Sequence, residues 1–263
     1  MRQAYDSDLT DDEWEIILPL LPKAFDLGRP ATVDMREVMN GTFYILKNGC
    51  TWQNLPHDLP PYSTVFFYFQ RWTNIGLIEE INQKLSELVR IADGRESTPS
   101  LASLDSQTVK TTESAGSRGF DGGKKIKGRK RHIIVDSLGL LIGVVVHTAD
   151  IGERAGAKLL LASLKYPLLR LKKILVDKGY SGVEMTDWVK ENFNWIWEVS
   201  KSPDNQKGFI VESKRWIVER TFAWLGKCRR LSKDYEYHEK MSESFVYLAL
   251  IRIMLRNLTP VNS

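Results

Sequence analysis

The sequence predicts a mixed α/β fold preceded by an all-helical N-terminal region. Two observations carry this prediction. Up to about residue 91, apolar residues recur with the period of amphipathic helices. After a polar linker at 95–100, strand-like apolar runs alternate with helical stretches. A chain of 263 residues can form one large domain or two smaller ones, and we expect domains at 1–96 and 97–263.

The N-terminal region is expected to contain four helices. Thr10 and Glu13 fit a capping box, which predicts the start of the first helix. The other three are expected at 33–47, 63–74 and 76–91. Several short helices with a Trp- and Pro-containing turn are typical of helix-turn-helix-like organisation.

The second region predicts a mixed sheet with flanking helices. Strands are expected at 101–105, 131–136, 140–148, 173–177 and 195–200, and helices at 152–165 and 182–193. A hairpin signal at 136–139 joins the second and third strands. An antiparallel start followed by parallel crossovers is the order of a ribonuclease-H-like fold.

Three carboxylates stand out in this region. Asp105 and Asp177 each close an apolar strand-like run, and Glu219 lies in an aromatic-rich helical stretch. Taken singly, the aspartates could accept turn hydrogen bonds, and Glu219 could pair with Arg215 or Arg220. Together they suit one or two hard cations, Mg²⁺ or Mn²⁺, of the kind that support in-line phosphoryl displacement. Other acids lack this combination of setting and order, namely Asp121, Asp136, Asp150, Glu153 and Asp187.

A dense basic run lies between the two aspartates. Six of the eight residues 124–131 are Lys or Arg, and glycines precede them, so we interpret 113–131 as a basic insertion loop. Net charge is −6 over residues 1–96 and +10 over the remainder. A solvated surface is one explanation, but a run that leads into the catalytic sheet favours phosphate contacts. The residues expected to contact DNA are Lys124, Lys125, Lys127, Arg129, Lys130, Arg131, Arg215, Arg229 and Arg230.

The sequence composition argues against a membrane-spanning, a secreted or a disulfide-bonded protein. The longest strongly apolar run, at 140–146, is far shorter than a membrane span, and the acidic first residues lack a signal-peptide core. Cys50 and Cys228 have no CxxC partner, so we expect reduced thiols in a cytoplasmic protein.

Two features leave alternatives open. Trp216, Phe222 and Trp224, close to Glu219, are either core residues or a stacking platform for an unpaired DNA base. The N-terminal helices either recognise DNA ends, through a helix that begins near Tyr62, or serve dimerisation or packing.

As a set, these motifs resemble the DDE-class transposases of bacterial insertion sequences, family five of the family-four/five superfamily. The most specific block, at 215–236, reads RWIVERTFAWLGKCRRLSKDYE and is similar to the Glu-containing motif. Blocks at 101–112, 128–157 and 174–182 resemble the other catalytic motifs in the right order, and blocks at 10–22, 48–56 and 243–258 also look familial. In the family-four pattern Tyr-x2-Arg-x3-Glu-x6-Lys, Arg215 and Glu219 fit, whereas Glu212 and Gly226 occupy the Tyr and Lys places.

The resemblance implies a ribonuclease-H-like catalytic domain with Asp105, Asp177 and Glu219 as the catalytic triad and two bound Mg²⁺ or Mn²⁺ ions. It implies cleavage at the ends of a mobile element and transfer of the strands to target DNA. A homodimer or larger synaptic assembly, acting on the bacterial nucleoid, is expected. The alternatives are a catalytically silent, domesticated transposase that regulates by binding DNA, and a metal-dependent nuclease without strand transfer.

Overall fold

The computed structural model describes residues 2–22, 33–113, 115–200 and 216–259. Its helical N-terminal region consists of α1 (Asp11–Ile17), α2 (Met35–Asn48), α3 (Tyr62–Asn74) and α4 (Leu77–Ala92). The predicted capping box is confirmed, because the Glu13 amide donates to Thr10 and the Thr10 amide donates to Glu13. Each helix begins within two residues of its predicted start.

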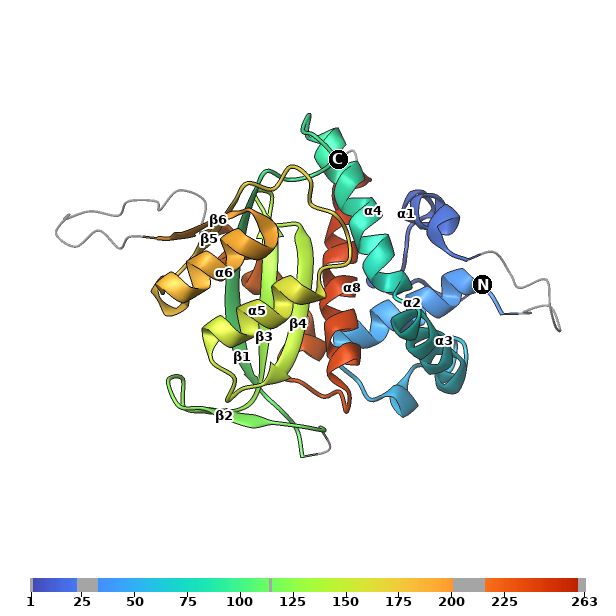
Figure 1. Ribbon diagram of the computed structural model, residues 1–263. Helices are drawn as coiled ribbons and strands as arrows, with labels where there is room; N and C mark the ends of the chain where they lie inside the picture. Colours follow the sequence, from blue (N-terminus) through green and yellow to red (C-terminus); the bar gives the residue numbers. More distant parts are fainter. Residues whose placement is uncertain (1, 23–32, 114, 201–215, 260–263) are drawn as a thin grey trace, which may run out of the picture.

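The chain after residue 100 is built on one mixed sheet (Figure 1). Its strands are β1 (Leu101–Lys110), β2 (Gly119–Asp121), β3 (Ile126–Asp136), β4 (Leu141–Thr148), β5 (Lys173–Val176) and β6 (Ile196–Val199). β3 is antiparallel to β1, β2 and β4, whereas β5 is parallel to both β1 and β6. The predicted antiparallel start with parallel crossovers is confirmed, and the fold is ribonuclease-H-like.

Helices cover both faces of this sheet (Figure 1). On one face, α5 (Glu153–Ser163) and α6 (Val183–Phe193) bury an apolar cluster that includes Leu104 and Ile174. On the other face lie α7 (Trp216–Leu225) and α8 (Glu239–Leu258). Within the described part of the chain, no helix has the length and apolar character needed to cross a bilayer.

The long helix α8 connects the two regions. It packs against β4 on the sheet side and against α1, α2, α3 and α4 on the other. A single apolar cluster therefore runs from Leu9 to Leu255 and includes residues of both regions. The predicted division at residue 97 separates two kinds of secondary structure, but the hydrophobic core continues across it.

Two strands are longer than predicted. β1 continues to Lys110 and β3 begins at Ile126, and the two pair along their whole length, from Ala102 with Asp136 to Lys110 with Gly128. Asp105 therefore lies within β1 instead of closing it. The segment 113–131 is not simply a loop, because it contains β2 and the first half of β3.

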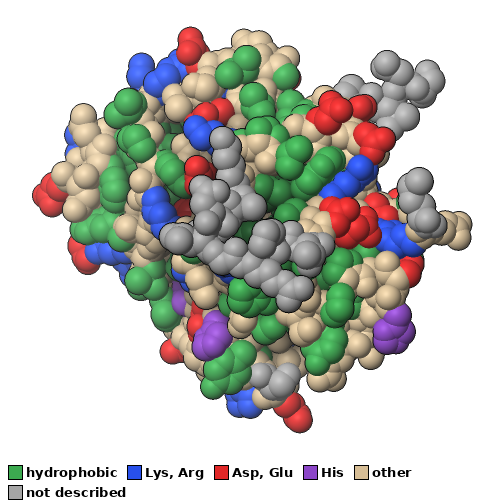
Figure 2. All heavy atoms as spheres, turned by 90° about the vertical axis from the view of Figure 1, so that its right-hand side faces the viewer, with side chains coloured by type: hydrophobic (Ala, Val, Ile, Leu, Met, Phe, Trp, Pro, Cys, Tyr) green, Lys and Arg blue, Asp and Glu red, His purple; other side chains and the backbone are tan. Residues whose placement is uncertain are grey.

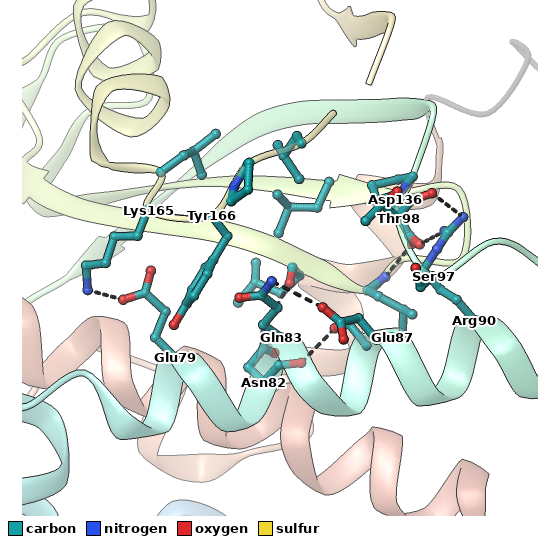
Figure 3. Close-up of a pocket in the computed structure, with 18 residues that line it drawn as sticks. Glu79, Asn82, Gln83, Glu87, Arg90, Ser97, Thr98, Asp136, Lys165 and Tyr166 are labelled. Atoms are coloured by element: carbon teal, nitrogen blue, oxygen red, sulfur yellow. Dashed lines mark hydrogen bonds and ion pairs between the residues drawn. The ribbon is translucent and has the colours of Figure 1, made fainter. Parts of the chain in front are cut away.

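A buried ion pair fixes the β3–β4 turn to α4. Asp136 is 1% exposed, and its carboxylate accepts hydrogen bonds from the amides of Leu138 and Leu140, at 2.8 and 2.9 Å. Its second oxygen pairs with the guanidinium of Arg90 (Figure 3). Arg90 also donates to the Glu96 carbonyl at 2.9 Å. Asp136 thus closes the turn, as the hairpin signal predicts, and also neutralises a buried cation.

Removal of this carboxylate should destabilise the protein strongly. We expect Asp136→Ala to lower the free energy of unfolding by about 3–5 kcal/mol, because Arg90 stays buried without its counter-ion. Urea denaturation measures the change. The matched control is Asp93→Ala, which removes the exposed partner of Arg95 and should change stability by less than about 0.5 kcal/mol. Equal losses in the two variants contradict the assignment.

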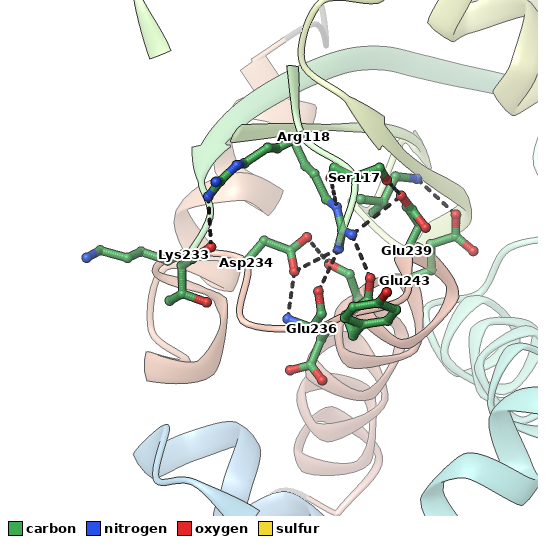
Figure 4. Close-up of polar contacts among 12 residues, drawn as sticks. Ser117, Arg118, Lys233, Asp234, Glu236, Glu239 and Glu243 are labelled. Carbon is green, nitrogen blue, oxygen red and sulfur yellow. Dashed lines mark hydrogen bonds and ion pairs between the residues drawn. The ribbon is translucent and has the colours of Figure 1, made fainter. Parts of the chain in front are cut away.

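Glu243 contributes an ionisable group to the contact between α8 and β4. It accepts a hydrogen bond from the Val146 amide at 2.9 Å (Figure 4 shows its position on α8). Burial raises the pKa of Glu243 from its ordinary value of 4.5 to about 7, although the hydrogen bond from Val146 acts in the opposite direction. The folded protein therefore holds a proton here at pH values where the unfolded chain has released it.

This proton makes stability depend on pH. Since the folded state binds more protons between pH 4.5 and pH 7, the contribution of Glu243 to the free energy of unfolding falls as pH rises through that window. The loss amounts to at most about 3 kcal/mol. Glu243→Gln should remove this fall and be more stable than wild type above pH 7, whereas Glu191→Gln, at an exposed position on α6, should follow the wild type. Urea titrations at several pH values provide the measurement, and parallel curves for all three proteins contradict the prediction.

Candidate active site

The structure places Asp105 and Asp177 on the same face of the sheet. Side chains alternate along a strand, and Leu104 in β1 and Val176 in β5 both point into the cluster under α5 and α6. Asp105 and Asp177, each the next residue along, therefore point to the opposite face. Asp177 keeps an extended backbone, with φ −83° and ψ 178°, so the alternation continues through it.

The two aspartates also lie at the same level. The parallel pairing of β1 with β5 reaches Ser103 opposite Leu175, and two residues further along each chain are Asp105 and Asp177. Each carboxylate accepts a hydrogen bond from a backbone amide one or two residues further along the chain. Asp105 accepts from the Ser106 amide at 2.7 Å, and Asp177 accepts from the Gly179 amide at 2.8 Å, which caps a short 3-10 turn.

Glu219 comes from α7, which packs against β1 and β3 on this same face. Ile217, Val218 and Thr221 are buried beneath the helix, and Glu219 is exposed. Thr221 donates to the Gly139 carbonyl at 3.1 Å, so the helix that carries Glu219 is attached to the β3–β4 turn.

The aromatic residues around Glu219 have a structural role. The Arg220 guanidinium lies between two indoles, 4.7 Å from the ring centroid of Trp216 and 4.6 Å from that of Trp224. The same guanidinium donates to the Leu138 carbonyl at 2.9 Å. These contacts favour packing over base stacking for Trp224, whereas Trp216 remains 43% exposed.

The donor types of the three carboxylates, and not their spacing, suit a divalent cation. Within the four described ranges, no three His, Cys, Asp or Glu side chains lie close enough to hold one ion between them. The donor set is nevertheless that of a hard-cation site, because it consists of carboxylate oxygens alone. Asp105 and Asp177 share one level and one face, and α7 brings Glu219 to that face.

A second polar cluster, which the sequence patterns do not predict, surrounds Glu153 at the start of α5. Its Oε2 accepts hydrogen bonds from Ser106 Oγ at 2.7 Å and from Tyr180 Oη at 3.1 Å. Its Oε1 accepts from Lys130 Nζ at 3.0 Å, and His132 Nε2 lies 3.1 Å from Oε2. We call these five residues the Glu153 cluster. They come from β1, β3, α5 and the turn after β5, so no sequence spacing relates them.

Glu153 is ionised within this cluster. Burial works to raise its pKa, but hydrogen bonds from His132, Ser106 and Lys130 outweigh burial and hold the pKa far below its ordinary value. Burial also lowers the pKa of His132, against the raising effect of Glu153. The only signal in the sequence that points to Glu153 is its place in the first turn of a helix, where the helix dipole favours an acidic side chain.

Two of the basic residues expected to contact DNA are fully buried. Arg129 is 0% exposed and donates to the carbonyls of Ser117, Glu236 and Tyr237 at 2.8–2.9 Å, next to Asp234. Arg131 is 1% exposed and donates to the carbonyls of Leu231 and Lys233. Figure 4 shows the segment around Asp234 and Glu236 that receives these bonds. Their geometry assigns both arginines to fixing residues 231–239 against β3.

The remaining basic residues divide into two groups. Lys130 is 4% exposed and Arg230 is 7% exposed, and they pair with Glu153 and Glu236 respectively, so they have no surface with which to contact a phosphate. Arg215 lies outside the described residues. Four of the predicted contacts are exposed and available to DNA, namely Lys124, Lys125, Lys127 and Arg229.

Comparison with known proteins places the chain among transposases. Residues 96–254 match the family described as "Transposase DDE domain", and residues 9–82 match a family described as transposases of the IS4/5 family. A 117-residue segment is 28% identical to the uncharacterized protein y4sN of Sinorhizobium fredii, covering 44% of this chain and 87% of that protein. A 128-residue segment is 25% identical to a Burkholderia cepacia protein named as a transposase for insertion sequence element IS402, covering 46% of this chain and 60% of that protein.

No solved structure matches the chain. The two family matches cover separate segments. The match at 9–82 ends within α4, and the match at 96–254 begins between α4 and β1. Because the match to the transposase DDE domain alone extends over more than half of the chain, the protein belongs to the DDE transposases of the IS4/5 family.

Proposed function

We propose that this transposase cleaves the ends of an insertion sequence and transfers the freed strands to target DNA, with Asp105, Asp177 and Glu219 as its catalytic residues. The observation that carries the proposal is the placement of Asp105 and Asp177 level with each other on the sheet face against which α7 packs. In this proposal Asp105, Asp177 and Glu219 are the residues that would hold Mg²⁺ or Mn²⁺, because carboxylate oxygens are the ligands these ions prefer. Bound there, two divalent ions would supply charge stabilisation for the entering and leaving oxygens of an in-line displacement at phosphorus.

The exposed lysines of the β2–β3 hairpin bind the DNA backbone in this proposal. Lys124, Lys125 and Lys127 lie at or next to the hairpin tip, where Lys125 has a left-handed backbone with φ +54°. β2 extends away from the body of the sheet (Figure 1). Phosphate contacts from such a hairpin orient the duplex without reading its sequence.

The N-terminal helices supply either DNA-end recognition or dimerisation. The face of the molecule on which they lie mixes acidic and apolar side chains with scattered basic ones (Figure 2). On α3, Tyr62 is 44% exposed and Phe67 is 54% exposed, so apolar contacts are available there. We propose that the protein acts on nucleoid DNA in the bacterial cytoplasm as a dimer or larger assembly that brings two element ends together.

A cleavage assay tests the catalytic assignment. The substrate is DNA that carries the sequences flanking the gene, incubated with Mg²⁺ or Mn²⁺. We expect wild-type protein to nick it and Asp177→Asn to lose more than about 100-fold in rate, because loss of outer-shell metal partners alone typically costs about 10–100-fold. The matched control is Asp187→Asn, at an exposed position on α6, which should keep the wild-type rate.

The other outcomes separate the alternatives. Binding to the DNA without nicking, under either metal, contradicts the catalytic assignment and fits a DNA-binding regulator. Nicking without joining to a target plasmid fits a metal-dependent nuclease.

The salt dependence of DNA binding tests whether the hairpin lysines contact phosphates. Replacing Lys124, Lys125 and Lys127 together by alanine should weaken binding and reduce the slope of log K against log salt by up to about 3, since each phosphate contact contributes about 0.9. Fluorescence anisotropy at several salt concentrations measures the slope. The control variant replaces Lys84, Lys172 and Lys190, three exposed lysines outside the hairpin, and an equal change in its slope contradicts the assignment.

A further inference from the structure

We propose that Glu153 is a positioning residue that fixes the spacing between Asp105 and Asp177, through hydrogen bonds from Ser106 and Tyr180. This inference rests on the proposed function, in which the two aspartates hold the metal. It assigns to a residue of the opposite sheet face a role in metal affinity.

The two donors to Glu153 are directly connected to the two aspartates. Ser106 follows Asp105 in β1, and Tyr180 ends the 3-10 turn that Asp177 caps. Both hydroxyls donate to the same atom, Glu153 Oε2, at 2.7 and 3.1 Å. One oxygen atom therefore fixes the position of both aspartate-bearing segments.

A connection between β1 and the segment that follows β5 is needed at the level of the two aspartates, because the strand pairing ends before them. The parallel pairing of β1 with β5 ends at Ser103 and Leu175, two residues before the aspartates. Beyond that point, β5 has passed into the 3-10 turn, and the strand ladder does not set its distance from β1. The bonds to Glu153 join the two segments where the ladder has ended.

Glu153 has the contacts of a positioning residue and not of a metal ligand. A carboxylate offers about four lone-pair sites. Ser106, Tyr180 and Lys130 donate to three of them, and His132 Nε2 lies 3.1 Å from Oε2. Lys130 also neutralises the charge of Glu153, with Nζ 3.0 Å from Oε1, so the carboxylate already has a cationic partner within the protein.

The surroundings keep this cluster rigid. Tyr180 is 0% exposed, and its carbonyl accepts a hydrogen bond from Trp197 Nε1 at 3.1 Å. One turn into α5, a Cβ added at Gly156 would lie 2.2 Å from Cε1 of His132. The helix that carries Glu153 thus packs directly on the His132 ring, and Glu153 has little freedom to move.

The experiment measures Mn²⁺ binding to the full chain without DNA, by calorimetry, beside Mn²⁺-dependent nicking. Ser106→Ala and Tyr180→Phe each remove one donor, and Glu153→Gln removes the charge. We expect each to weaken Mn²⁺ affinity by about 10–100-fold, the range typical of outer-shell partners. Nicking at saturating Mn²⁺ should recover toward the wild-type rate, because the ligands themselves remain.

The effects of these substitutions on Mn²⁺ affinity should also be non-additive. If Ser106 and Tyr180 act through Glu153, their effects on Mn²⁺ affinity should largely disappear in a Glu153→Ala background, which removes both acceptor oxygens. Glu191→Gln is the matched control on α6, away from the cluster, and should bind Mn²⁺ as wild type does. Melting curves establish that each variant is folded, and Tyr180→Phe, which loses a single oxygen, remains informative if Glu153→Gln does not fold.

The outcomes distinguish this inference from the proposed function. Lower melting temperatures with unchanged Mn²⁺ affinity in Ser106→Ala and Tyr180→Phe overturn the inference and leave Glu153 as a structural ion pair. Wild-type Mn²⁺ affinity in Asp177→Asn overturns the metal site itself, and the inference with it.

Discussion

The structure depends on pairing the charges buried along β3. Arg129, Lys130, Arg131 and Asp136 are each 4% exposed or less. A charge left alone in such a place costs several kcal/mol, so each must have a partner. These partners lie on different elements around β3. Carbonyl groups in residues 231–239 accept from the two arginines, Glu153 on α5 pairs with Lys130, and Arg90 on α4 pairs with Asp136. The position of these elements around the sheet follows from that requirement.

The two faces of the sheet have different parts in the proposed chemistry. One face carries Asp105 and Asp177, the proposed metal ligands, and α7 packs against that face. The other face carries the Glu153 cluster, in which Ser106, Tyr180 and Lys130 donate hydrogen bonds to the partly buried Glu153 carboxylate. Because alternate residues of one strand serve the two faces, Asp105 and its neighbour Ser106 connect them without any intervening element.

Local patterns predicted much of this structure, and long-range pairing decided the rest. Caps and apolar periods located the N-terminal helices within two residues of their starts, and strand order predicted the mixed sheet. The apolar run that ends at Asp105 suggested a strand end, but pairing with β3 carries β1 on to Lys110. Arg129 and Arg131 were predicted to contact DNA because they belong to a dense basic run. The carbonyls that they bind lie about a hundred residues further along the chain, so no local pattern marks these arginines as buried. The partners of Glu153 come from β1, β3 and the turn after β5, so no local pattern predicts its cluster either.

The position of α8 has a consequence for biosynthesis. α1 and α2 leave the ribosome long before α8, yet their apolar sides are completed by it. At about 5–20 residues per second, roughly ten to fifty seconds separate the two events. During that interval the early helices must remain partly unpacked or be shielded by other proteins. Nascent chains therefore expose apolar surface that the folded molecule buries, and the N-terminal helices can complete their packing only after α8 has been synthesised.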